Sequence, residues 1–116
     1  MFNFFKPKKA RTKYIIASEV ASLIDLVISK TDFDSFQNGF IVLSEDMTVS
    51  FRQSKSAART SDKVWVKVSE LDGLSALQLA HEMGESSMLH MFTDQVAYAA
   101  VRTLSSNATF DSLPSS

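Results

Sequence analysis

The segment FIVLSEDMTVSFRQSKSAARTSDKVWVKV, residues 40–68, decides the fold class of this chain. Residues 40–43 are continuously apolar, which predicts a short buried strand. Residues 47–52 and 63–68 alternate apolar and polar side chains, which is the period of strands with one buried face. Only Ser44-Glu45-Asp46 separates the first two runs, so we expect a hairpin there and a longer connection to the third strand.

Helices are predicted on both sides of these strands. In residues 16–30 the apolar side chains recur at the spacing of one buried helical stripe, at Val20, Leu23, Ile24 and Val27. A second helical pattern runs from residue 72 to about residue 105, and Gly84 inside it predicts a break, since glycine costs about 1 kcal/mol relative to alanine. The expected fold is α+β, in the order α-β-β-β-α-α. A small three-stranded antiparallel sheet would carry an N-terminal helix and one long or two shorter C-terminal helices on one face.

The length of 116 residues predicts one domain. We assign residues 1–13 to a basic, aromatic arm, residues 14–106 to a single α+β domain and residues 107–116 to a polar tail. Within the domain, residues 31–39 are rich in turn-forming Asp, Asn and Gly and are expected to form a linker. The chain has no cysteine and no apolar stretch near the ~20 residues of a spanning helix, so we expect a cytoplasmic protein.

The charges are segregated along the chain, although the net charge is only −1. Ten of the twelve Lys and Arg residues fall within residues 1–13 and 52–67. Residues 14–51 hold one basic residue against six acids, and so do residues 69–116. Such a layout gives a nearly neutral protein a positive side and a negative side, which can orient it on a partner.

The sequence contains no recognisable catalytic constellation. The string His81-Glu82-Met83-Gly84-Glu85 begins like a zinc-peptidase motif, but Glu85 stands where the second histidine should be and His90 falls out of register. The three glycines are isolated from one another, so no phosphate-binding loop is present. We therefore expect no enzyme activity, no metal site and no cofactor.

The most distinctive predicted surface is the outer face of the sheet. If the valines of the third strand face the helices, alternation places the lysines of that strand and the single tryptophan on the opposite face. The predicted partner-binding residues lie on this face and on the connection before the third strand: Trp65, Arg52, Lys63, Lys67, Lys55 and Arg59. Tryptophan and arginine are enriched in protein-binding hot spots, so a protein partner with an acidic surface is the leading interpretation.

Two other interpretations concern the same residues. Aromatic side chains among cations on a sheet also stack and hold single-stranded nucleic acids, so nucleic-acid binding is the second interpretation. In the third, the arm or the connection of residues 53–62 covers Trp65, and no partner is involved.

The N-terminal arm carries a further set of cations, Lys6, Lys8, Lys9, Arg11 and Lys13, beside the aromatic residues Phe2, Phe4, Phe5 and Tyr14. We expect these cations to steer the protein toward an acidic partner. Aromatic and basic segments also bind anionic membrane surfaces, where each cation contributes about 1 kcal/mol, so peripheral membrane association is an alternative. A further alternative is that the phenylalanines dock the arm onto its own domain.

Both long helices carry apolar residues outside their main stripes, among them Ile15, Leu26 and Tyr98. A three-stranded sheet cannot cover all of this surface. Either the helices also pack on each other, or a second subunit covers them, which makes a homodimer an alternative to a monomer.

The order α-β-β-β-α is similar to that of the double-stranded RNA-binding domain. That family has a Gly-Pro-x-His type loop after its first strand and a lysine-rich start to its last helix. Here the corresponding turn is Ser44-Glu45-Asp46, and the C-terminal helical region begins with Glu70, Asp72 and Leu74. The resemblance is one of topology, so no functional residue is carried over.

Overall fold

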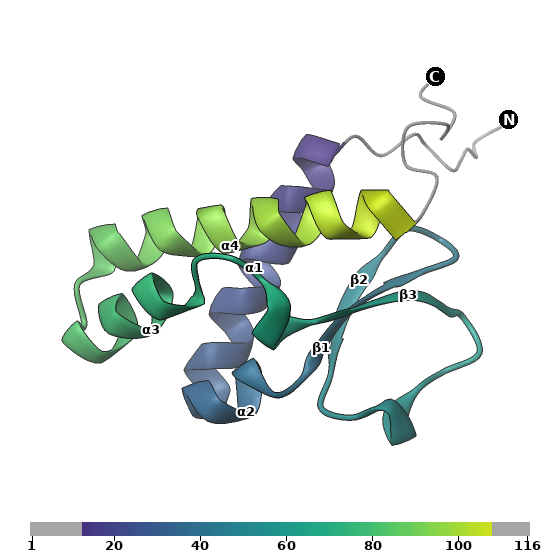
Figure 1. The fold of residues 1–116 in the computed structure, drawn as a ribbon, viewed down its shortest axis with the longest axis horizontal. Coiled ribbons are helices and arrows are strands. Elements are labelled where there is room, and N and C mark those ends of the chain that lie inside the picture. Colours follow the sequence, from purple (N-terminus) through teal and green to yellow (C-terminus); the bar gives the residue numbers. More distant parts are fainter. Residues whose placement is uncertain (1–12, 108–116) are drawn as a thin grey trace, which may run out of the picture.

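The computed structural model describes residues 13–107 and confirms the predicted α+β architecture (Figure 1). The helices and strands are, in chain order, α1 (Lys13–Lys30), α2 (Phe33–Gln37), β1 (Phe40–Ser44), β2 (Val49–Arg52), β3 (Asp62–Lys67), α3 (Leu74–Met83) and α4 (Ser86–Asn107). Two short 3-10 turns, Lys55–Ala57 and Val68–Glu70, lie on either side of β3. Most of the predicted arm and of the predicted tail lies outside the described residues.

The three strands form one antiparallel sheet in the order β2-β1-β3, with β1 in the centre. The predicted hairpin between β1 and β2 is therefore confirmed, and the chain then passes from one edge of the sheet to the other. Phe40 of β1 pairs with Arg52 of β2 on one side and with Lys67 of β3 on the other. The β1–β3 register shifts near Ser44, which leaves Lys63 at an irregularity in β3.

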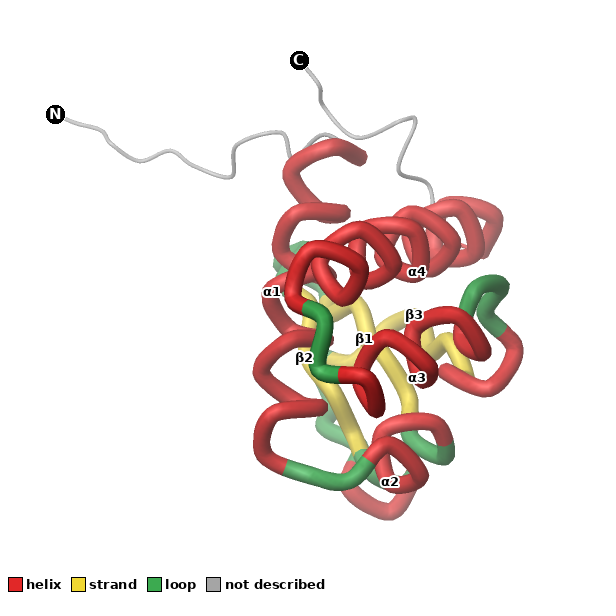
Figure 2. Tube along the Cα trace, turned by 90° about the vertical axis from the view of Figure 1, so that its left-hand side faces the viewer, coloured by secondary structure: helices red, strands yellow, loops and turns green. Residues whose placement is uncertain are grey.

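The helices cover one face of the sheet, and Figure 2 shows α3 and α4 in front of the strands with α1 beside them. Helices α1 and α4 pack against each other, α1 lies against β2, and α4 lies against β3. The core between these layers joins the inner face of the sheet to the apolar stripes of the helices, and its fully buried members include Ile16, Val20, Ile24, Ile41, Leu43, Val66, Leu77, Val96 and Leu104. The stripe predicted for α1 is confirmed at its centre, where Val20 and Ile24 are buried.

A short helix, α2, occupies part of the segment that we expected to be a linker, so that prediction is wrong for its central residues. The carboxylate of Asp32 caps this helix by accepting a hydrogen bond of 2.7 Å from the backbone N–H of Ser35. This bond holds the pKa of Asp32 below its ordinary value. Phe33 and Phe36 are both buried, with ring centroids 5.6 Å apart, so tertiary packing stabilises a helix too short to persist alone.

The predicted break at Gly84 is confirmed. Gly84 has a φ of 70°, a left-handed conformation that glycine adopts without steric penalty, and it ends α3. The carboxylate of Glu85 then accepts hydrogen bonds from the backbone N–H groups of Ser87 and Met88, at 3.2 and 3.3 Å. These bonds satisfy donors that the first turn of α4 would otherwise leave unpaired.

We expect Phe36→Ala to lower the free energy of unfolding by about 3–5 kcal/mol. Phe36 is fully buried, and its ring stacks on that of Phe51 in β2 with centroids 6.0 Å apart, so truncation leaves a cavity between α2 and the sheet. The control is Leu26→Ala, an apolar truncation at a side chain that is 52% exposed. For this control we expect a change within about 0.5 kcal/mol. Urea unfolding followed by circular dichroism measures both variants, and equal losses would contradict the described burial.

Candidate partner-binding face

The outer face of the sheet is the face turned away from the helices, and the pairing register defines its members. Val42 pairs with Trp65, while Phe40 lies between Arg52 and Lys67. Directly paired residues share a face, and so do alternate residues of one strand. The structure thus brings together three of the predicted site residues, Trp65, Arg52 and Lys67, around Phe40 and Val42.

An aromatic pair lies on this face, with a lysine above it. The rings of Phe40 and Trp65 meet edge to face, with centroids 5.4 Å apart. Lys55, from the 3-10 turn after β2, places its Nζ atom 5.7 Å from the Phe40 centroid and 5.6 Å from the Trp65 centroid. Both distances are within the range of cation–π attraction. We call Phe40, Lys55 and Trp65 the aromatic–lysine cluster.

Sequence reasoning missed Phe40 as a member of this face. Residues 40–43 are all apolar, so no alternation tells which side chains point away from the helices. A signal was nevertheless present. A continuously apolar strand in a sheet with helices on one side must place some apolar side chains on the other side.

The outer face is not open along its whole length, which corrects our expectation. Val42 is 0% exposed although it pairs with Trp65 on the face away from the helices. On this side its cross-strand neighbour is Trp65, and the Nζ atom of Lys55 lies over the ring of Trp65. Trp65 itself remains partly exposed.

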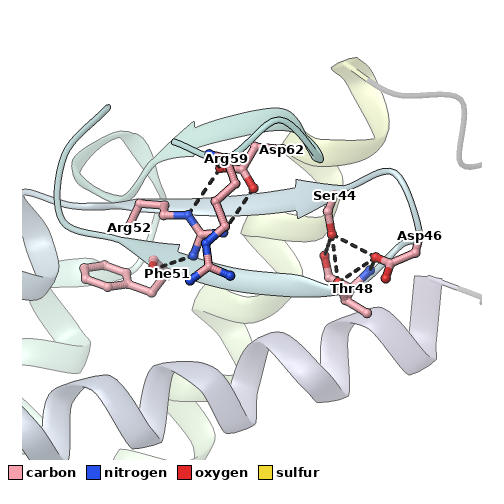
Figure 3. Close-up of polar contacts among 7 residues, drawn as sticks. All are labelled: Ser44, Asp46, Thr48, Phe51, Arg52, Arg59 and Asp62. Carbon is pink, nitrogen blue, oxygen red and sulfur yellow. Dashed lines mark hydrogen bonds and ion pairs between the residues drawn. The ribbon is translucent and has the colours of Figure 1, made fainter. Parts of the chain in front are cut away.

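Arg52 forms an ion pair with Asp62 at the start of β3 (Figure 3). Its Nε and Nη2 atoms donate to the two carboxylate oxygens at 3.2 and 3.1 Å, which is a bidentate arrangement. The two side chains are only 13% and 1% exposed, respectively. Arg52 is therefore not the free surface cation that we expected. It joins the two ends of the connection between β2 and β3.

The backbone N–H of Arg59 donates a further hydrogen bond of 2.9 Å to Oδ2 of Asp62. This bond and, after it, the bond from the Arg52 guanidinium hold the pKa of Asp62 below its ordinary value of 3.8. The ionised carboxylate of Asp62 thus binds Arg52, at the start of the connection, and the backbone of Arg59, near its end. The side chain of Arg59 is itself exposed.

The remaining predicted cations are Lys63 and Lys67 on β3 and the steering cations of the predicted arm. Lys63 and Lys67 are both exposed on β3, and Lys67 pairs with Phe40 of the aromatic–lysine cluster. Lys63 falls at the strand irregularity, so simple alternation does not fix its direction. Of the steering cations, Lys13 is the first residue of α1, and the others lie outside the described residues, namely Lys6, Lys8, Lys9 and Arg11.

Hydroxyl groups hold the β1–β2 turn at the other end of these strands (Figure 3). Ser44 Oγ and Thr48 Oγ1 donate to Oδ1 of Asp46 at 2.9 and 2.7 Å, and the Thr48 backbone N–H donates at 3.1 Å. The hydroxyls of Thr48 and then Ser44 hold the pKa of Asp46 below its ordinary value. Met47, which we expected in the strand, lies in this turn with a φ of 69°.

His81 and Glu85, from the string that begins like a zinc-peptidase motif, make contacts within the fold. The His81 ring lies 6.2 Å, centroid to centroid, from that of Phe33, and Glu85 caps α4 as described above. On α4, His90 Nε2 lies 3.8 Å from a carboxylate oxygen of Asp94. Within residues 13–107, no group of three His, Asp or Glu side chains is arranged to hold a metal ion.

The lowered pKa of Asp62 predicts a contribution to stability that acid removes. The folded-state pKa lies below the ordinary value of 3.8, so the stabilisation is present above that pH and is lost as the pH falls through the folded-state pKa. Between roughly pH 5 and pH 2, wild type should therefore lose more unfolding free energy than Asp62→Asn, which has no carboxylate to protonate.

Urea unfolding at a series of pH values makes this comparison. The control is Leu26→Ala, at an exposed apolar residue of α1, which leaves every carboxylate in place and should keep the wild-type dependence on pH. The same dependence for wild type and Asp62→Asn would contradict the proposed role of the carboxylate.

None of the helices in the described part of the chain is both long and apolar enough to cross a membrane. Comparison of the whole chain with known protein families, curated proteins and solved structures gives no match.

Proposed function

We propose that this protein is a non-enzymatic cytoplasmic adaptor or inhibitor that binds a protein partner through the outer face of its sheet. The proposed contact surface is the aromatic–lysine cluster with Lys63, Lys67 and Arg59 at its edges. The observation that carries the proposal is the partly exposed Trp65, held between Phe40 and Lys55 on the face turned away from the α-helices of residues 13–107.

The geometry of Trp65 suits an anchor for a protein partner. Its ring is held by the edge-to-face contact with Phe40 and by the ammonium group of Lys55. A side chain already fixed in the free protein loses little conformational entropy on binding. Tryptophan is also among the residues that most often dominate the energy of a protein interface.

The charges around this anchor favour an acidic partner. Lys55, Lys63 and Lys67 are exposed, and the acid within the same stretch of chain, Asp62, is already paired with Arg52. Ammonium groups at the edge of an interface accelerate association with a surface of opposite charge and disfavour basic partners. In this proposal the cations of residues 1–13 add to the same long-range attraction.

Nucleic-acid binding by the same residues is the second proposal, because lysines beside an aromatic pair also suit a polyanion. The position of Lys55 favours the protein partner over this alternative. Bases stack on open aromatic faces, whereas Lys55 occupies the space above both rings of the cluster.

We expect Trp65→Ala to weaken partner binding by roughly 30-fold, which corresponds to about 2 kcal/mol for a hot-spot tryptophan. Lys67→Glu should also weaken it, by reversing a charge beside the cluster. The control is Lys30→Glu, the same reversal at an exposed lysine at the end of α1. Capture on the immobilised full chain, followed by affinity measurement with the captured protein, compares the variants.

Capture that is equally strong with all three variants would contradict the proposed surface. A polynucleotide titration in parallel decides between the two proposals. Phosphate contacts predict that the logarithm of affinity falls with the logarithm of salt concentration by roughly 0.7–0.9 per contact. Such a slope, together with its reduction in Lys67→Glu, would favour nucleic-acid binding instead.

A further inference from the structure

A second surface, on the helical side of the molecule, forms a groove between α1 and α4. Figure 1 shows α4 crossing α1, and the two helices are in contact. The groove beside this crossing has a volume of about 320 Å³. Its lining includes Tyr14, Ala17 and Ala21 of α1 and Asp94 and Tyr98 of α4. We call it the α1–α4 groove.

Two tyrosines project from opposite helices at this groove and are exposed to an unusual degree. Tyr14 is 71% exposed and Tyr98 is 45% exposed, and Ala17 and Ala21 line the groove with them. Large aromatic side chains that border a groove in this way offer apolar area to a docking segment.

The middle of the groove is acidic. Asp25 of α1 and Asp94 of α4 both line it, and among residues 13–107 neither a Lys nor an Arg does. The hydroxyl of Thr93, which is fully buried, donates to Oδ1 of Asp25 at 3.3 Å and so orients this carboxylate. A second hollow shares Asp25 and His90 with the groove and extends it toward Leu89. A segment that combines cations with apolar side chains would therefore be complementary to this surface.

We propose that the α1–α4 groove binds residues 1–12 of the same chain. This segment supplies the required chemistry, because it contains Lys6, Lys8, Lys9 and Arg11 without an acid, and Phe2, Phe4 and Phe5 beside them. It is joined directly to Lys13, the first residue of α1 and the neighbour of Tyr14 at the groove.

The length of the segment fits this position. Twelve extended residues span at most ~40 Å. Along α1, the distance from Tyr14 to Asp25 is only ~17 Å at 1.5 Å per residue. The segment can therefore reverse direction at the start of α1 and still bring its lysines to Asp25 and Asp94, with phenylalanines reaching the hollow beyond.

Docking in this way brings the basic block of residues 1–13 onto Asp25 and Asp94, one acid from each of the two acidic blocks. It uses the helical side of the molecule, so it does not depend on the partner-binding proposal for the outer face of the sheet. Docking of the segment would compete with its attraction to an acidic partner. The cations of residues 1–12 can interact with only one of these acidic surfaces at a time, the groove or the partner.

Engineered disulfides in the full chain test the docking, because the chain has no cysteine of its own. The test pair is Phe5→Cys with Ser22→Cys, since Ser22 is exposed and lines the groove. The matched control is Phe5→Cys with Ser56→Cys, at an exposed serine in the connection on the other side of the sheet. Non-reducing electrophoresis separates intramolecular from intermolecular disulfides.

We expect the test pair to form an intramolecular disulfide roughly tenfold faster than the control pair, because docking raises the effective concentration of the two thiols. Adding Asp25→Asn and Asp94→Asn, or about 1 M salt, should remove most of this difference. Equal rates for the two pairs would overturn the proposal. Disulfide-linked dimers as the main product would also overturn it, because they would place the segment in the groove of a second copy.

Discussion

The central strand β1 must be covered on both of its faces, and most of the structure follows from this constraint. Its residues 41–44 are all buried, although the helices cover only one side of the sheet. Ile41 and Leu43 belong to the core beneath α1 and α4, whereas Val42 is equally buried on the other side. On that side the cross-strand neighbour of Val42 is Trp65, so large side chains on the outer face contribute to this burial.

The connection between β2 and β3 contributes to the candidate binding face on this side of the sheet. The ion pair of Arg52 with Asp62 joins its two ends, and Lys55 lies over Phe40 and Trp65. The cover is incomplete, since Trp65 stays partly exposed. The outer face thus carries a fixed, partly exposed aromatic side chain among exposed lysines, which is why we place the proposed function there.

Local patterns in the sequence predicted the helices and strands that depend on residues close together in the chain. They failed where contacts between residues far apart in the chain determine the structure. A continuous apolar run predicted β1, alternation predicted β2 and β3, and Gly84 predicted the break between the last two helices. Helix α2 was not predicted because the packing of Phe33 and Phe36 in the core stabilises it, rather than helix propensity. Arg52 was expected to be a free cation because its bond to Asp62, ten residues later, exists only once the strand order β2-β1-β3 brings them together.

The most direct test of the proposed cover uses Trp65, the single tryptophan of the chain, as its own reporter. Acrylamide quenching of its fluorescence measures access to the ring without an effect of charge, because the quencher is neutral. If Lys55 lies over the ring, quenching should be intermediate in wild type and clearly stronger in Lys55→Ala, while Lys30→Ala behaves as wild type. Quenching in wild type that already equals that of unfolded protein, with no change in Lys55→Ala, would contradict the account.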